Sequence, residues 1–408
     1  MNVKRLGDTR RVEYLDGLRG VAALVVLIGH SWMMFSQPIS SYSSGDGVAA
    51  IPAMLLKVVG LVANGNSAVC IFFLLSGFVL ADFARGATIS FPAQVVRRYL
   101  RLAIPILITS TFAYCLLRFG LFRNAESARI FGEWAGAWYQ FDASFTAMTY
   151  EALVGTFATG SNAYNSNLWT MHPEMVGSFY ILLINAIPAT RRWRTALYGC
   201  LIAVHLFDYL PLFAVGALLR EYEVEVHRLG RMPWLPAALC LFGLYLCTLP
   251  DVTGGKLELV YPLPKFSFDN TRIWHSIGAT LLLGGVLTSS SAQQILASPV
   301  AKSLGRISFT LYLIHVPILC SLGAWLIVEL ATAGNATAAA IGLPVVLLVC
   351  LGSSVLLTPV VDVSAVRVSR RVGYWLDEMM TDSRSSTARR PPEFLPLADD
   401  RASSAPLS

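Results

Sequence analysis

Long apolar stretches recur along this chain of 408 residues, and short segments that carry most of the charge separate them. Clear examples are Val21–Ile28, Ala68–Ala81 and Gly342–Val361. A helix of about 18–20 mostly apolar residues crosses the hydrocarbon core of a bilayer. The pattern therefore predicts an all-α membrane protein, a bundle of about ten transmembrane helices. The expected ranges are 15–36, 67–84, 99–118, 168–188, 196–207, 208–220, 233–250, 272–289, 305–330 and 337–360.

Composition separates this chain from soluble globular proteins. Charged residues make up 14% of it and hydrophobic residues 55%, whereas soluble domains average about 25% charged residues. The net charge of +6 needs no nucleic acid to explain it, because basic cytoplasmic loops give membrane proteins the same balance. The seven cysteines lie mostly inside apolar runs and form no CxxC pair. We expect them to be buried hydrophobic residues and expect no metal site.

The positions of the basic residues predict an orientation. If the N-terminus is cytoplasmic, the segments on that side hold 23 of the 31 Lys and Arg residues, and the outer segments hold five. This bias follows the positive-inside rule and places both termini in the cytoplasm. A single span at 196–220 would invert the C-terminal half, so two short spans are predicted there. The predicted domains are a cytoplasmic segment at 1–14, a transmembrane domain at 15–362 and a cytoplasmic tail at 363–408, disordered after about 381.

Two ionisable residues interrupt the first apolar run, where they are costly and often functional. Arg19 and His30 are 11 positions apart, which is about 20° from three whole helical turns and about 16 Å along the axis. They therefore share one face, with Arg19 near the predicted cytoplasmic end and His30 deeper. This geometry predicts a path for a long substrate whose anionic end meets Arg19 and whose reactive group reaches His30. A snorkelling arginine and a buried structural histidine are the alternative interpretation.

Further polar residues stand at the ends of other predicted spans. Arg98 and Arg101 are three positions apart and so face one way at a helix start, where their guanidinium groups suit phosphate. Plain topological anchors would look the same. Glu174 opens the fourth span at about the predicted depth of His30, so its carboxylate could orient that imidazole. A glutamate that only interacts with the helix dipole is the alternative.

Aromatic residues gather in the outer segment between residues 123 and 167. A belt at the membrane interface is the favoured interpretation, and a sugar-binding surface or lid is the alternative. The residues concerned are Trp134, Trp138, Tyr139, Phe141 and Tyr164.

Several motifs occur together in the order typical of one protein family. The first span carries an arginine, ten residues and a histidine, and an RxxR element follows the second span. The chain resembles the acyltransferase 3 family of integral membrane O-acyltransferases over residues 12–372. The family's last helix often ends in Glu-x-Pro where this chain has Asp362-Val363-Ser364, so no role is assigned to Asp362. The matching segments are 13–20, FFLLSGFVL at 72–80, Arg98-Tyr99-Leu100-Arg101, Leu168-Trp169-Thr170 with Glu174, and LGRISFTLYLIHVP at 304–317.

The resemblance implies transfer of an acyl group from acyl-CoA, expected to be acetyl-CoA, to a hydroxyl group. His30 and Glu174 would be catalytic, and Arg19, Arg98 and Arg101 would bind acyl-CoA. The acceptor would be a carbohydrate, as in polysaccharide modification, or another extracytoplasmic or lipid-linked hydroxyl compound. The expected location is the bilayer of a bacterial inner membrane. Alternatives are acylation of a small-molecule metabolite, a transporter with an ion path through His30, Glu174 and Arg19, and a scaffold for polysaccharide synthesis.

Overall fold

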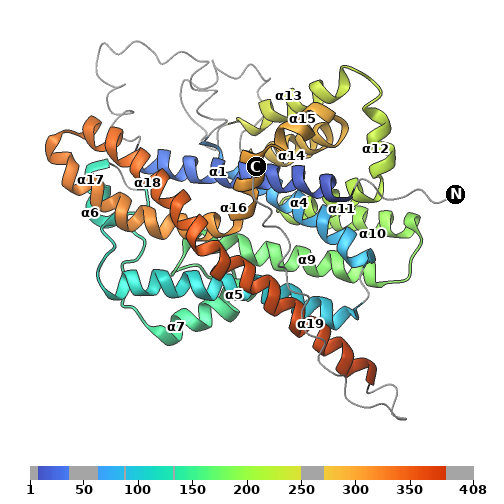
Figure 1. The fold of residues 1–408 in the computed structure, drawn as a ribbon, viewed down its shortest axis with the longest axis horizontal. Coiled ribbons are helices and arrows are strands. Elements are labelled where there is room, and N and C mark those ends of the chain that lie inside the picture. The colour runs from blue at the N-terminus through green and yellow to red at the C-terminus, as the bar shows by residue number, and fades with distance from the viewer. Residues whose placement is uncertain (1–7, 36–62, 87–88, 132–133, 250–270, 383–408) are drawn as a thin grey trace, which may run out of the picture.

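The computed structural model of the chain describes residues 8–35, 63–86, 89–131, 134–249 and 271–382, and these contain helices and no strands. The predicted disorder after about residue 381 falls almost entirely outside these residues. Figure 1 shows the helices gathered in one bundle, with the longest running across the view. The helices are α1 (Asp8–Phe35), α4 (Gly65–Gly86), α5 (Phe91–Arg118), α6 (Asn124–Phe131), α7 (Phe145–Tyr150), α8 (Thr156–Ala158), α9 (Met171–Ala186), α10 (Arg191–Val204), α11 (Leu210–Glu221), α12 (Glu223–Leu229), α13 (Leu235–Cys247), α14 (Thr271–Thr288), α15 (Ser290–Leu296), α16 (Pro299–Ile318), α17 (Ala324–Leu330), α18 (Asn335–Thr358) and α19 (Ser364–Asp382).

The prediction of an all-α fold is confirmed for the described residues, and their helices include candidates for membrane spans. Each of the ten predicted ranges overlaps a helix. Within the described ranges, five helical stretches are long and apolar enough to cross a membrane. The number of spans and the side on which each terminus lies stay predictions. The five stretches are Glu13–Phe35, Gly65–Gly86, Phe91–Arg118, Pro299–Ala333 and Thr337–Thr381.

The region 196–220 forms two helices, as predicted. Loop residues between Val204 and Leu210 separate α10 from α11. Arg194, near the start of α10, donates a hydrogen bond of 2.8 Å to the carboxylate of Glu221, the last residue of α11. The two helices therefore form an antiparallel hairpin.

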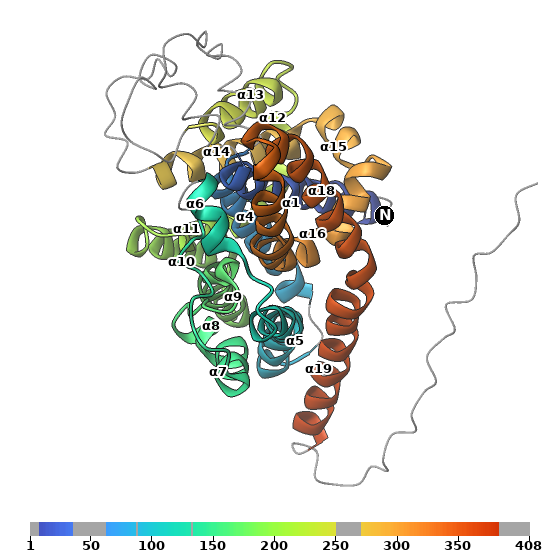
Figure 2. The same ribbon diagram turned by 90° about the vertical axis from the view of Figure 1, so that its left-hand side faces the viewer.

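The helical structure continues past the predicted start of the tail at residue 363. A π-helical turn at Pro359–Val363 joins α18 to α19. The side chain of Asp377 accepts a hydrogen bond of 2.7 Å from the backbone N–H of Ser90, which precedes α5. Figure 2 shows α5 between α9 on one side and α19 on the other. The predicted boundary at 362 thus falls within one continuous helical stretch, and α19 covers the first turns of α5.

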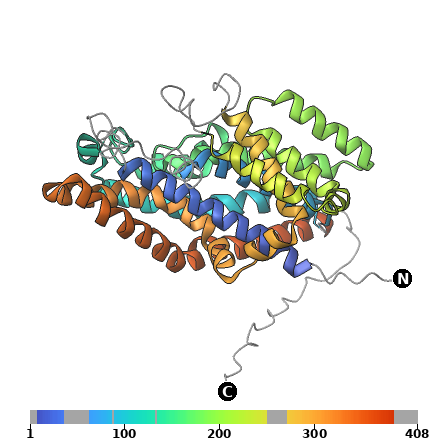
Figure 3. The same ribbon diagram turned by 90° about the horizontal axis from the view of Figure 1, so that it is seen from above.

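Helices α1 and α16 pack against each other more extensively than most other pairs and run parallel. A Cβ atom on Gly20 would lie 2.3 Å from the backbone nitrogen of Gly305, so only glycine permits this close approach. Ten residues further along both helices, the side chains of His30 and His315 meet. In Figure 3 the two helices lie side by side across the molecule. Their parallel register brings two histidines from distant parts of the sequence into contact.

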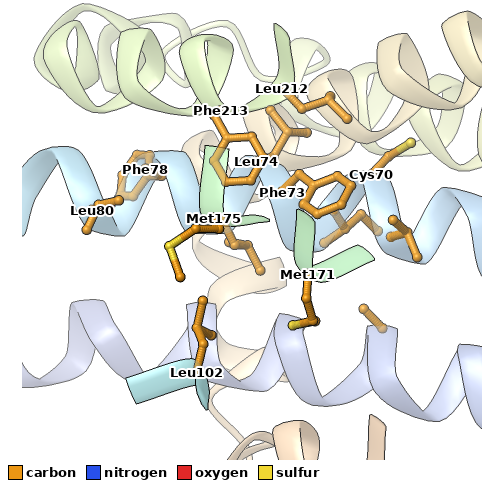
Figure 4. Packing of buried hydrophobic residues seen from close by; sticks show 14 of the residues in the cluster. Cys70, Phe73, Leu74, Phe78, Leu80, Leu102, Met171, Met175, Leu212 and Phe213 are labelled. Atoms are coloured by element: carbon orange, nitrogen blue, oxygen red, sulfur yellow. The ribbon is translucent and has the colours of Figure 1, made fainter. Parts of the chain in front are cut away.

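Helix α4 lies at the centre of the main hydrophobic core. Figure 4 shows Phe73 and Leu74 of α4 beside Phe213 of α11, with Met171 and Met175 facing α4 from α9. The ring centroids of Phe73 and Phe213 are 5.2 Å apart. This packing fixes α4 relative to α9, the two helices that supply one side of the candidate site.

Candidate functional site

A cavity of about 300 Å³ lies inside the bundle, between α1, α4, α5, α9 and α16 and the π-helical turn at Pro359–Val363. Its apolar wall is largely aromatic and aliphatic, including Phe72, Phe73, Leu102 and Met171. Its polar wall is densely charged. Five of the lining residues carry a charged side chain, namely Arg19, Arg98, Arg101, Glu174 and Asp362.

Arg98 is held by three polar side chains. Its Nε donates to Ser178 Oγ and its Nη2 donates to Ser76 Oγ, each over 2.9 Å. The same Nη2 donates to Glu174 Oε1, and the Ser76 hydroxyl donates to that oxygen as well. The side chains of Arg98 and Glu174 are only 20% and 13% exposed. A buried pair with this many hydrogen bonds fixes the guanidinium group at one place in the cavity wall.

Arg101 lies one helical turn beyond Arg98 and forms an ion pair with Asp362, with 2.6 Å between Nη1 and Oδ1. The Arg101 guanidinium carbon also lies 5.4 Å from the ring centroid of Phe309. The sequence assigns no role to Asp362, because the Glu-x-Pro pattern is missing there. Its position near the end of the last apolar run could have indicated a role, because a carboxylate at that depth is costly unless a basic side chain pairs with it.

Arg19 completes the basic part of the cavity wall from α1. Its Nη1 donates to Asp16 Oδ1 over 3.0 Å, and the side chains of both residues are partly exposed. The structure thus brings the three predicted arginines and Glu174 to one cavity. Their part in binding acyl-CoA stays a prediction.

His30 lies beyond the apolar end of this cavity and is not among the residues that line it. The rings of Phe72 and Tyr312 line the cavity and contact each other edge to face, with centroids 5.8 Å apart. Tyr312 in turn lies 5.9 Å, centroid to centroid, from His315. The open path predicted from Arg19 to His30 is therefore interrupted here by two aromatic side chains, which lie far from both residues in the sequence.

The predicted contact between Glu174 and His30 is absent from the described part of the chain. The Glu174 side chain contacts Ser76 and Arg98, while Nδ1 of His30 lies 2.8 Å from Nε2 of His315. The positions of the two residues in their spans predict only that they share a depth. Depth along a helix does not determine the direction of a side chain, and the start of α9 faces α5 rather than α1.

A strained loop lies against His30. Trp134 has its ring centroid 5.5 Å from that of the imidazole. Ala135 and Tyr139 adopt φ angles of 60° and 59°, which non-glycine residues rarely do outside functional or tightly held segments. The side-chain amide of Asn124 donates 2.7 Å hydrogen bonds to the carbonyl oxygens of Ala135 and Trp138. This anchoring keeps the loop over the histidine pair.

The loop corrects the favoured interpretation of the outer aromatic residues. Tyr139 is 5% exposed and stacks on Phe122 with ring centroids 3.8 Å apart. An interfacial belt is therefore wrong for Tyr139, and Trp134 contacts His30 instead. Phe141 remains exposed. The sequence could not show which of these neighbouring aromatic residues are buried and which are exposed, because the turn at 134–139 points some of their side chains into the protein.

Comparison with known proteins gives the same family that the motifs indicated. The model of the acyltransferase 3 family, described as an acyltransferase domain, matches residues 12–356. Acyltransferase R4 of Phoma sp. and acyltransferase clz18 of Cochliobolus lunatus are each 23% identical to the chain, over 76% of it and 83% of their own length. The O-acetyltransferase PaAT-1 of Phomopsis amygdali is 26% identical, over 76% of this chain and 72% of its own. No solved structure matches.

The family match and the names of the relatives show that the chain is an enzyme that transfers acyl groups, which favours this interpretation over the transporter and scaffold alternatives. The three relatives are fungal, so they give no support to a bacterial inner membrane, and which membrane holds the protein stays a prediction. The match covers α1 through most of α18 and thereby includes every cavity residue except Asp362. The chain belongs to the acyltransferase 3 family.

Proposed function

We propose that the protein transfers an acyl group, acetyl in the first instance, from acyl-CoA to a hydroxyl group of a carbohydrate or related acceptor. The observation that carries the proposal is the cavity in which Arg19, Arg98 and Arg101 converge. An acyl-CoA donor is a thioester with phosphate groups at its other end. The name of one relative, O-acetyltransferase, supports acetyl transfer to oxygen.

The three arginines suit the phosphate end of the donor. A guanidinium group presents five N–H donors in a planar fork, which matches phosphate oxygens. Glu174 and Asp362 neutralise part of this charge, and the lining still carries one more arginine than carboxylate. We infer that the carboxylates hold Arg98 and Arg101 in place before the donor binds, which lowers the entropic cost of ordering them.

His30 is the proposed general base. Its imidazole would take the proton from the acceptor hydroxyl as the oxygen attacks the thioester carbon. The C–O bond forms, the C–S bond breaks, and the proton then passes to the thiolate of CoA. Because Phe72 and Tyr312 lie between the cavity and the histidine pair, the acyl end of the donor must displace one of these rings to reach His30. A small acyl group such as acetyl requires the smallest displacement.

The test uses purified protein in lipid nanodiscs, acetyl-CoA, and a panel of monosaccharides, oligosaccharides and simple alcohols. Released CoA thiol and acetylated product are measured. His30→Ala is expected to lower product formation about 10²–10⁴-fold, with acetyl-CoA binding unchanged and the protein still folded. His205→Ala is the matched control, because His205 pairs with Asp208 in the loop before α11 and lies outside the site. Near wild-type activity of His30→Ala, or no CoA release with any acceptor, would overturn the proposal.

A further inference from the structure

Two imidazole rings meet in the interior of the bundle, one from α1 and one from α16. Nδ1 of His30 and Nε2 of His315 are 2.8 Å apart. The ring planes are nearly parallel, with an angle of 17° and centroids 5.1 Å apart. A contact of this length between two ring nitrogens requires one proton between them, so one histidine donates and the other accepts.

The other nitrogen of His315 decides which ring donates. Nδ1 of His315 lies 3.1 Å from the backbone carbonyl oxygen of Leu311, one turn earlier in α16. A carbonyl oxygen only accepts hydrogen bonds, so Nδ1 of His315 carries a proton. His315 is fully buried, and the hydrogen-bond partners that the structure gives it are His30 and the backbone of Leu311 and Tyr312, none of them a carboxylate. A buried ring without a counter-charge is favoured in its neutral form, which leaves Nε2 of His315 as an acceptor.

The state of His30 follows from this chain of hydrogen bonds. Because Nε2 of His315 accepts, Nδ1 of His30 must donate, and the lone pair of neutral His30 is then on its Nε2. We propose that His315 is a positioning residue that fixes this tautomer and makes Nε2 of His30 the atom that removes the proton from the acceptor hydroxyl. This inference rests on the proposed function, in which His30 is the base.

His315 also stabilises the intermediate state of the transfer. When Nε2 of His30 takes the hydroxyl proton, the ring becomes a cation with N–H groups on both sides. Its Nδ1–H still donates to the neutral Nε2 of His315, so no hydrogen bond has to be rearranged during the step. The proton on Nε2 then passes to the departing thiolate, and both histidines return to their starting forms.

The helix packing explains why the two rings have this register. Gly20 and Gly305 bring the backbones of α1 and α16 together ten residues before the histidines. Since the helices run parallel, ten residues advance both chains by about 15 Å and about the same angle. A histidine on each helix at that offset therefore meets the other. Glu174, the residue that the sequence predicts for this role, is held in the cavity by Arg98.

The experiment compares His315→Gln with His315→Leu in the nanodisc assay. The side-chain oxygen of glutamine can accept the hydrogen bond from Nδ1 of His30, whereas leucine cannot. We expect His315→Leu to lower kcat on the order of 10²-fold with the KM for acetyl-CoA unchanged, and His315→Gln to regain most of that loss. Equal kcat for His315→Leu and wild type, or a glutamine variant as slow as the leucine variant, would overturn the proposal.

A spectroscopic readout keeps the proposal testable when the leucine variant does not fold. The chain has six histidines, so the ¹⁵N signals of His30 in labelled protein are identified by their loss in His30→Ala. We expect a protonated Nδ1 and an unprotonated Nε2 on His30 in the wild type and in His315→Gln. The reverse tautomer would refute the inference. Full activity of His30→Ala would instead refute the proposed function, so the two failures are distinguishable.

Discussion

The pairing of Arg98 with Glu174 gives the sharpest test of how the cavity is built. The two side chains are 20% and 13% exposed, so water screens them weakly. Removing one partner of a buried ion pair costs about 3–5 kcal/mol, because the other charge stays buried and uncompensated. Arg98 retains its hydrogen bonds to Ser76 and Ser178 when the carboxylate is lost. We therefore expect Glu174→Leu to destabilise the protein by about 3 kcal/mol, the lower end of that range.

The double variant Arg98→Met/Glu174→Leu distinguishes a paired charge from two independent contacts. Replacing both partners by apolar residues of similar volume leaves no buried charge, and such replacements are often neutral for stability. We expect the double variant to melt above Glu174→Leu in detergent, with a coupling of about 1–3 kcal/mol between the two sites. Intrinsic fluorescence of the nine tryptophans follows the unfolding. A double variant that melts below both single variants would refute the reasoning.

A conservative variant of Glu174 distinguishes its two possible roles, which are positioning Arg98 and orienting His30. If the carboxylate positions Arg98 for the donor, Glu174→Gln raises the KM for acetyl-CoA and changes kcat little. If it served His30, kcat would fall while KM stayed constant. We expect the first result, because the hydrogen bonds of Glu174 go to Ser76 and Arg98. A pure kcat effect comparable to that of His30→Ala would contradict this assignment.

Three further predictions concern residues around the cavity and in the core. Arg101→Ala should raise the KM for acetyl-CoA about tenfold or more, since a charged hydrogen bond contributes about 1.5–3 kcal/mol. The control is Arg306→Ala, which removes an exposed arginine on α16 outside the cavity lining and should leave the KM unchanged. Trp134→Ala should lower kcat/KM for the acceptor a few-fold, because it removes one aromatic contact with His30, worth about 0.5–1.5 kcal/mol. An unchanged kcat/KM would show that the strained loop has no part in the reaction. Gly77→Ala should lower the melting temperature, because the new Cβ would lie 2.1 Å from the backbone oxygen of Phe213 and overpacking of this kind costs about 1–3 kcal/mol. Gly86→Ala on the same helix meets nothing within 4 Å and should melt like the wild type.

The long apolar runs determined the fold class, because the bilayer constrains the sequence of each span directly. A span must be long, apolar and helical to satisfy its backbone within lipid. That constraint placed both ends of α4 and the C-terminal ends of α1 and α5 within about two residues, and it separated α10 from α11. The starts of α1, α5 and α16 lie six to eight residues before the predicted spans, because a helix can continue past its apolar stretch. The cost of charge in lipid likewise marks Arg19, Arg98, Arg101 and Glu174 from their sequence positions alone, and all four lie around one cavity.

Pairing between side chains was decided only by the tertiary structure. Position within a span indicates the depth of His30 and Glu174 but carries no information on the rotation of α9 relative to α1, so the sequence paired two residues that do not meet. His315 lies almost 300 positions after its partner His30, and the parallel packing of α1 with α16 brings the two together. Asp362 lies more than 250 positions after its partner Arg101, and the contact of α5 with the turn before α19 brings these two together. Hydrophobic pattern and charge cost act on each helix separately, whereas the contacts of a site depend on how several helices pack together.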